Sequence, residues 1–164
     1  MKRKLIGIGL VLALLLTLSA CGAKTADISD YGNTKITISG LTDEDFTVTP
    51  DELAKLECVS RTATGATAKA GTVEAYGPLL DTFLAQYHCK MSDFQKIRFL
   101  ALDGYKTVLK GEYLTDYEVV LAVSRGKNPL PESQQPLRIL IPDAESSMWE
   151  YAVTRIEFVR EADS

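Results

Sequence analysis

Alternation of apolar and polar positions dominates residues 35–160 and predicts a domain built mainly of strands. Successive side chains of a strand point to opposite faces of a sheet, and β-branched residues, which are frequent here, favour that conformation. The stretch 118–124 is apolar along most of its length, so we expect it to be a central strand. The predicted strands are 35–40, 46–48, 57–64, 72–76, 96–102, 105–110, 118–124, 137–141 and 152–159.

Two short helices are predicted between these strands. Thr49-Pro50-Asp51-Glu52 has the composition of a capping box, in which the threonine and glutamate side chains each accept a hydrogen bond from the other's backbone N–H, and proline suits the first helical position. This motif predicts a helix that continues to about Leu56. Apolar residues at helical spacing predict a second helix, with one buried face, over 79–87.

Glycine and proline residues mark the predicted turns. Asp103-Gly104 joins two strands, and 65–71 is a loop of small residues. Residues 128–131 contain two prolines, which lack the backbone N–H that a sheet interior needs, so they are expected to form a loop. With no internal repeat, the pattern predicts a single compact α+β domain, predominantly β, with mixed sheets and a few short helices.

The first twenty residues have a different pattern, typical of an export signal. Three basic residues precede the apolar run Leu5–Leu16, which is too short to cross a bilayer that requires about 20 apolar residues. The following Leu18-Ser19-Ala20-Cys21 resembles the lipobox of bacterial lipoproteins, in which the cysteine receives a diacylglyceryl group and becomes the new N-terminus. This interpretation is favoured over a plain secretory signal or an uncleaved anchor.

These features divide the chain into four parts. We expect a lipoprotein signal peptide over 1–20, a lipidated N-terminus and flexible tether over 21–34, the folded domain over 35–160, and a short tail over 161–164. The protein would then be held on the extracytoplasmic face of a bacterial cell membrane by the acyl chains on Cys21.

Charge narrows the range of partners. The full chain has 18 basic and 22 acidic residues, and removal of 1–20 takes away three basic residues and no acids, which leaves a net charge of −7. An acidic domain is a poor partner for nucleic acid or for anionic lipid headgroups. The remaining partners are the membrane, reached through the lipid on Cys21, and an envelope protein or small ligand.

Several residues leave a structural and a functional interpretation open. Cys58 and Cys89 could form a disulfide in an oxidising compartment, but two separate half-buried thiols are favoured. Trp149, Tyr151 and Tyr76 could line a binding cleft, although single aromatic residues in strands are more often part of the core.

The order of motifs along the domain resembles the oxidoreductase molybdopterin-binding domain family, which includes the central domain of sulfite oxidase. The resemblance covers roughly Lys35–Arg160. The motifs that carry it are TPDELAKL (49–56), YGPLLDTFL (76–84), ALDGY (101–105), LAVSRGKNPLP (121–131), PLRILIP (136–142) and TRIEFV (154–159).

The resemblance implies a molybdenum held by a pterin and by one cysteine thiolate, in the strand after the capped helix. The corresponding stretch 59–65 contains no cysteine, and Cys58 precedes it, so Cys58 would be the metal ligand only if the register were different. Active relatives also have glycine and lysine after the PLR strand, near the pterin phosphate, whereas Pro142–Glu150 contains acids. The export signal has no arginine pair, which cofactor-loaded exported enzymes normally carry.

We therefore expect no catalytic residue, no metal and no bound cofactor. Arg138, Asp103, Gly104 and Tyr105 match cofactor-binding positions of the family, but an arginine paired on the sheet surface and a turn glycine explain them more simply. The expected function is a ligand-binding or protein-interaction module in an envelope lipoprotein. The alternative is a molybdopterin-dependent oxidoreductase of the sulfite oxidase type.

Overall fold

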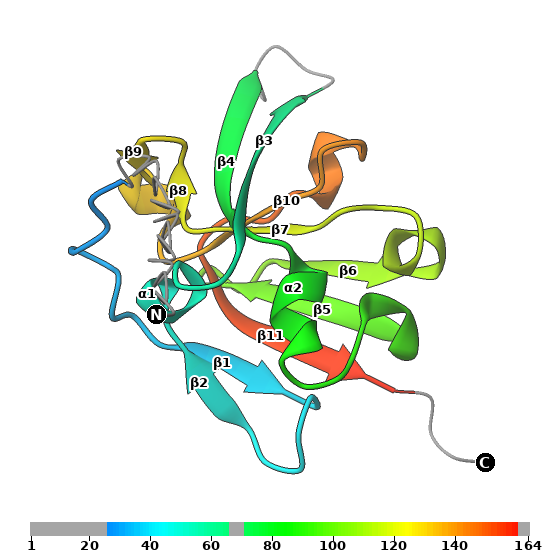
Figure 1. The fold of residues 1–164 in the computed structure, drawn as a ribbon. Helices are drawn as coiled ribbons and strands as arrows, with labels where there is room; N and C mark the ends of the chain where they lie inside the picture. Colours follow the sequence, from blue (N-terminus) through cyan, green and yellow to red (C-terminus); the bar gives the residue numbers. More distant parts are fainter. Residues whose placement is uncertain (1–25, 66–70, 161–164) are drawn as a thin grey trace, which may run out of the picture.

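Three β-sheets form the body of the domain in the computed structural model, which describes residues 26–65 and 71–160 (Figure 1). The predicted signal peptide, Cys21 and the predicted tail lie outside the described residues. Along this part of the chain, no helix has the length and apolar character needed to cross a membrane.

The largest sheet contains the first and the last strand of the domain. Its strand order is β2-β1-β11-β5-β6; β1 runs parallel to β11, and the other neighbours are antiparallel. The predicted mixed sheet is therefore confirmed. The strands are β1 (Ile36–Ser39), β2 (Phe46–Val48), β5 (Lys96–Ala101), β6 (Lys106–Lys110) and β11 (Val153–Val159).

A four-stranded sheet and a strand pair complete the β structure. The four-stranded sheet has the order β3-β4-β8-β9, and β10 pairs with β7 between this sheet and the five-stranded one (Figure 1). These strands are β3 (Cys58–Thr64), β4 (Thr72–Pro78), β7 (Val120–Ala122), β8 (Ser124–Arg125), β9 (Asn128–Pro129) and β10 (Arg138–Leu140).

The prediction of a loop over 128–131 is wrong for the first two residues. Asn128–Pro129 forms β9, in which Pro129 pairs with Ser124. Proline is tolerated here because β9 is the outermost strand of its sheet, where a missing N–H removes no ladder hydrogen bond on the open side.

Both predicted helices are present but shorter than expected. The capping box forms at α1 (Pro50–Leu53): Glu52 N donates to Thr49 Oγ1 at 3.3 Å, and Thr49 N donates to Glu52 Oε2 at 2.8 Å. The second helix, α2 (Leu80–Ala85), buries Leu80, Phe83 and Leu84. Single 3₁₀ turns occur at η1 (Met91–Asp93), η2 (Gly111–Leu114), η3 (Glu132–Gln134) and η4 (Ser146–Met148).

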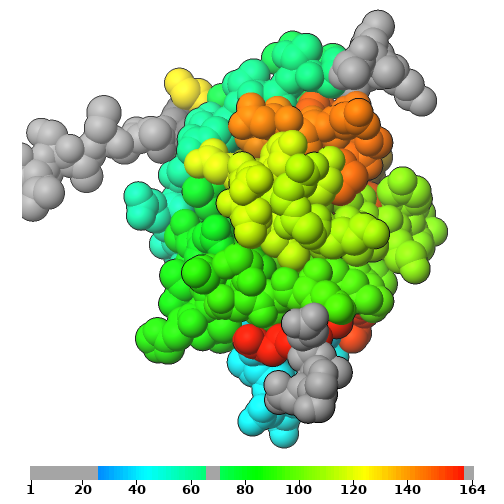
Figure 2. Space-filling model, turned by 90° about the vertical axis from the view of Figure 1, so that its right-hand side faces the viewer, coloured from blue at the N-terminus to red at the C-terminus, as the bar shows by residue number. Residues whose placement is uncertain are grey.

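The core follows the apolar run that predicted a central strand. Residues 119–124 are all buried, although the backbone divides there into β7 and β8. On one face of the molecule, residues near 115 lie beside residues near 145 (Figure 2), which places the end of β10 against the segment before β7.

The segment before β1 is held to the domain by Tyr31. This side chain is only 3% exposed, and its hydroxyl donates to Val123 O at 2.7 Å and accepts from Leu130 N at 2.9 Å. The predicted tether over 21–34 therefore includes residues that pack against the domain, and the folded part begins before Lys35. One aromatic residue within a polar stretch has no periodicity that would have revealed this packing.

Candidate functional site

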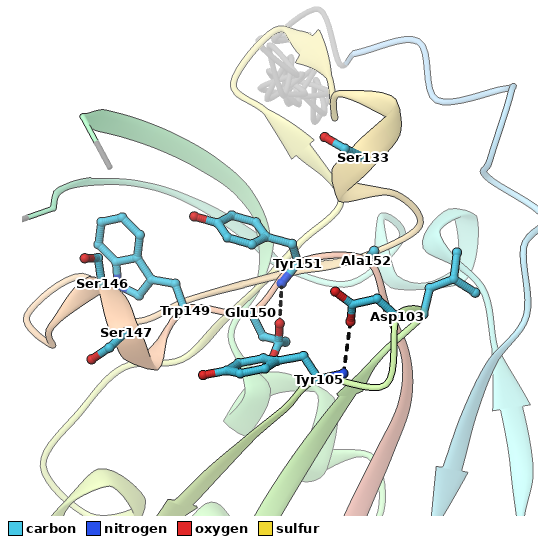
Figure 3. Close-up of a pocket in the computed structure, with 10 residues that line it drawn as sticks. Asp103, Tyr105, Ser133, Ser146, Ser147, Trp149, Glu150, Tyr151 and Ala152 are labelled. Carbon is cyan, nitrogen blue, oxygen red and sulfur yellow. Dashed lines mark hydrogen bonds between the residues drawn. The ribbon is translucent and has the colours of Figure 1, made fainter. Parts of the chain in front are cut away.

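A cavity of about 530 Å³ opens where the β5–β6 turn meets the segment before β11 and the η3 turn (Figure 3). Three separate parts of the chain contribute to its wall, so it exists only in the folded domain. The lining residues are Leu102, Asp103, Tyr105, Ser133, Ser146, Ser147, Trp149, Glu150, Tyr151 and Ala152.

Exposed apolar surface gathers at this cavity. Of the residues that the structure describes, the exposed large hydrophobic ones are Leu102, Tyr105 and Tyr151, at 76%, 60% and 36%. All three line the cavity. Soluble domains rarely concentrate exposed apolar side chains without a binding role, so the cavity is the leading candidate for a functional site.

One wall is formed by the turn between β5 and β6. Tyr105 N donates to Asp103 Oδ1 at 2.9 Å, and Gly104 has a φ of +86°, a conformation that favours glycine. The predicted turn is confirmed, and its backbone conformation is enough to explain a glycine at position 104 without any contact to a cofactor. The turn also brings Asp103 and Tyr105 to the cavity, so these two family-matched residues lie at the candidate site.

The opposite wall is formed by the residues that follow η4. Trp149 is 3% exposed and donates from Nε1 to Ile141 O at 2.9 Å. Glu150 forms a backbone bridge with Ile139, with N···O distances of 2.8 and 3.1 Å. This bridge ties the wall to β10. Trp149 therefore agrees with both interpretations offered for it, as a core residue and as a residue that lines a cleft, because it is buried and also lines the cavity.

Glu150 is the most unusual ionisable group of the cavity. Its side chain lies between those of Tyr105 and Tyr151 (Figure 3), and the residue is 3% exposed. Thr107 Oγ1 donates to Oε2 at 2.9 Å, and Tyr151 N donates to Oε1 at 3.0 Å. Burial raises the pKa of this carboxyl group, and the nearby Asp103 adds to the effect.

Arg138 lies behind the aromatic wall, which corrects the sequence interpretation. An arginine paired on the sheet surface was expected, but the residue is 2% exposed and makes no salt bridge within the described part of the chain. It donates to Gln134 Oε1 at 3.1 Å and to the Tyr151 hydroxyl at 3.4 Å, while its Nε has no partner among the described residues. Burial lowers the pKa of the guanidinium, and Arg125 contributes to the shift.

The same guanidinium stacks on two aromatic rings. Its central carbon lies 4.6 Å from the centre of the Tyr151 ring and 5.7 Å from that of Trp149. Arg138 does not itself line the cavity. Its position instead fixes two of the side chains that do.

Cys58 lies elsewhere, at the first residue of β3. Its half-buried thiol is 3.9 Å from Leu53 O and 3.8 Å from Ala54 O, and burial raises its pKa. Cys58 and Cys89 are both free, as the favoured interpretation predicts. Within 26–65 and 71–160, no three His, Cys, Asp or Glu side chains are placed to hold a metal ion.

Comparison with known proteins identifies the family. The sequence matches the oxidoreductase molybdopterin binding domain over residues 23–164. The chain belongs to this family. The resemblance predicted from the order of motifs is therefore confirmed.

Among solved structures, the fold is similar to that of the sulfane dehydrogenase SoxCD from Paracoccus pantotrophus, with a TM-score of 0.62 and 21% sequence identity. That alignment covers 86% of this chain but 41% of the SoxCD chain, so the present chain spans less than half the length of that protein. No curated protein matches the sequence.

Part of the candidate site could not be found from sequence. The motif ALDGY indicated Asp103 and Tyr105, and the PLR motif indicated Arg138. Ser133 and the residues around η4 carried no sequence pattern for a site. In the segment that follows, Trp149 and Tyr151 were named as residues that could line a cleft, and the acids within Pro142–Glu150 were noted only as a departure from the family.

Proposed function

We propose that this molybdopterin-type domain binds a small ligand in the cavity beside Glu150 and serves as a ligand-binding module of an envelope lipoprotein. The observation that carries the proposal is the gathering of Leu102, Tyr105 and Tyr151 at one cavity of ordinary ligand size.

The charges of the cavity argue against molybdopterin as its occupant. The pterin cofactor carries a phosphate and therefore needs cationic or N–H-rich surroundings. Among the residues that the structure describes, the charged ones in the lining are Asp103 and Glu150, and none is a lysine or arginine. Like charges in a partly desolvated site repel strongly, so this lining does not fit the group.

The environment of Cys58 gives independent support for loss of the metal ligand. A molybdenum ligand must be a thiolate, which cationic neighbours stabilise. The Cys58 thiol instead faces two backbone carbonyl groups, and the pKa of the thiol is raised by burial. The thiol also lies outside the cavity lining. No cofactor is therefore part of the proposed function.

The alternative, a molybdopterin-dependent oxidoreductase, has one structural observation in its favour. The Nε atom of Arg138 is buried and has no hydrogen-bond partner in the part of the chain that the structure describes, and Arg125 lies close enough to affect the pKa of Arg138. Two arginines near each other are typical of a site for an anion. A cofactor phosphate outside the cavity would satisfy both.

Elemental analysis separates the two functions. Protein purified from its native membrane is expected to contain no stoichiometric molybdenum and no pterin fluorescence. About one molybdenum per chain, lost in the variant Cys58→Ala, would establish the alternative.

Native mass spectrometry of the same preparation tests ligand binding directly. Ser133→Trp places a large side chain at the exposed edge of the cavity, and Asp43→Trp introduces the same residue at an exposed turn elsewhere. We expect a co-purified small molecule in the wild type and in Asp43→Trp, and its loss in Ser133→Trp. Equal occupancy in all three would contradict the proposed cavity.

Membrane attachment remains part of the proposal and rests on the lipobox around Cys21. A diacylglyceryl cysteine supplies two chains, which suffice for stable anchoring. The variant Cys21→Ser should move the protein from the membrane fraction to the soluble extracytoplasmic fraction. Unchanged fractionation would refute the lipid anchor while leaving the ligand site untested by that experiment.

A further inference from the structure

We infer that the ligand of this cavity is a small organic cation, an amine that is protonated or quaternary and is attached to a compact apolar body. The inference rests on the proposed function, because it names the chemical class that the same cavity would select.

The first argument is the balance of charge. Two carboxylates, Asp103 and Glu150, line the cavity, and among its described lining residues there is no lysine, arginine or histidine. Arg138 lies behind the wall, and even when its charge is counted the surroundings remain net negative. An anionic ligand would meet repulsion from both acids, whereas a cation would be attracted.

The second argument is the arrangement of Glu150. The residue is only 3% exposed, and its carboxylate makes no salt bridge with any residue in the described part of the chain. Its two hydrogen bonds come from the Thr107 hydroxyl and from the Tyr151 amide, both neutral donors. A carboxylate has about four acceptor positions, so capacity remains for a donor in the cavity.

A buried carboxylate without a cation is costly, and a cationic ligand would offset that cost. The carboxylate is also held in place before any ligand arrives, because the hydrogen bonds from Thr107 and Tyr151 and the backbone bridge to Ile139 fix its position. Such preorganisation favours binding because little order has to be gained.

The third argument is the aromatic wall. Tyr105, Trp149 and Tyr151 line the cavity, and the faces of aromatic rings attract cations. The molecule already uses this interaction, since Arg138 stacks over Tyr151 and Trp149. Tyr105 is 60% exposed and is free of such a contact among the described residues, so its ring can receive a ligand.

The volume of the cavity and the side chains that line it do not suit a metal ion. The cavity of about 530 Å³ is far larger than a metal ion requires, and no metal-binding group of three side chains occurs within the described residues. A compact organic molecule fills such a space and uses its apolar walls.

Trp149 provides the probe, since it is the only tryptophan of the chain and lines the cavity. Its fluorescence can be titrated with choline and with 3,3-dimethylbutan-1-ol, in which a carbon atom replaces the charged nitrogen without changing the shape. We expect a saturable change with choline, and binding of the neutral compound to be at least about tenfold weaker. Equal affinities, or no response to choline, would overturn the inference.

Substitutions identify the residue responsible. Glu150→Gln keeps the shape but removes the charge, and we expect choline affinity to fall about tenfold or more while the neutral compound is unaffected. Asp103→Asn, at an exposed position, should weaken choline binding about twofold to threefold and keeps the test available if Glu150→Gln fails to fold. Asp43→Asn removes an equal charge at a distant turn and should leave binding unchanged. Full choline affinity in both cavity variants would contradict the inference.

Failure of this inference can be distinguished from failure of the proposed function. If native mass spectrometry shows a neutral or anionic molecule that Ser133→Trp excludes, the cavity binds a ligand but the cationic class is wrong. If Ser133→Trp changes nothing, the proposed function itself fails.

Discussion

Two regions of the molecule, the cavity around Glu150 and the start of β3 around Cys58, each contain a titratable group whose pKa is raised by burial. The contacts that surround the two groups differ. At Glu150 the decisive contacts join distant parts of the chain, since Thr107 lies 43 residues away. At Cys58 the contacts come from nearer parts of the chain: two carbonyl groups four and five residues earlier, and the Tyr76 hydroxyl on the neighbouring strand β4. The first environment is a property of the whole fold, and the second belongs to one turn and the β3–β4 hairpin that follows it.

This difference indicates which region can have kept a function. A carboxylate held by long-range contacts, with aromatic side chains around it, fits the proposed ligand site. A thiol that faces its own turn is arranged for packing. The family provides the scaffold for both, but only the cavity combines charge, apolar surface and space.

The largest effect should come from the wall of the cavity. Trp149→Ala removes a side chain that is 3% exposed, together with its hydrogen bond to Ile141 O. We expect a loss of about 3–5 kcal/mol in the free energy of unfolding, measured by urea denaturation with a fluorophore other than tryptophan. A loss below about 1 kcal/mol would show that the wall is not an integral part of the fold.

A smaller effect is expected where the N-terminal segment meets the domain. Tyr31→Phe keeps the ring but removes the hydroxyl that bonds Val123 O and Leu130 N. The two buried backbone groups then lack a partner, and we expect a loss of about 1–3 kcal/mol by the same measurement. An unchanged free energy of unfolding would mean that this contact, although long in sequence, is not coupled to the domain.

Glu150 should make stability depend on pH. Its pKa is raised by burial, so the ionised carboxylate is less stable in the folded protein than in the unfolded chain, and stability falls as pH rises from the ordinary pKa of glutamate through the folded pKa. Glu150→Gln should therefore raise the melting temperature by a few degrees at pH 7, and the gain should vanish in acid below the ordinary pKa of glutamate. A gain that is equal at both pH values would contradict this explanation.

The thiol region should respond weakly. Cys58→Ala is expected to cost less than about 1 kcal/mol, because the side chain is only half-buried and its contacts, with two backbone carbonyl groups and the Tyr76 hydroxyl, are weak sulfur hydrogen bonds. The raised pKa of Cys58 keeps the thiol protonated at neutral pH, so its alkylation by iodoacetamide should be slow at pH 7 and accelerate at alkaline pH. Rapid alkylation at pH 7, read by mass spectrometry, would contradict the assigned environment.

The smallest effect is expected for the ion pair between Arg61 and Glu118. Arg61 Nε donates to Glu118 Oε2 at 2.7 Å, but the side chains are 35% and 47% exposed. Water and salt screen such a pair, so Arg61→Ala should cost about 0.2–1 kcal/mol, and less at high ionic strength. A larger cost would show that exposed contacts of the β3 region matter as much as those of the cavity.

The features that the sequence predicted correctly are those that depend on local sequence patterns. Period-two alternation located the strands of the mixed sheets, and the capping box placed the start of α1 at Pro50. The burial of Arg138 could not be predicted, because nothing in PLRILIP indicates that Tyr151 and Gln134 will receive the guanidinium. Glu150 is a similar case, since its environment depends on Thr107 in another strand.

The contact made by Tyr31 also sets how far the domain can stand from a membrane. Tyr31 is the tenth residue after Cys21, and ten residues of fully extended chain span at most about 35 Å. If Cys21 carries the proposed lipid, the domain stays within this distance of the bilayer and cannot diffuse through the envelope. Its cavity would then sample solutes at the membrane surface, where small cations accumulate next to anionic headgroups.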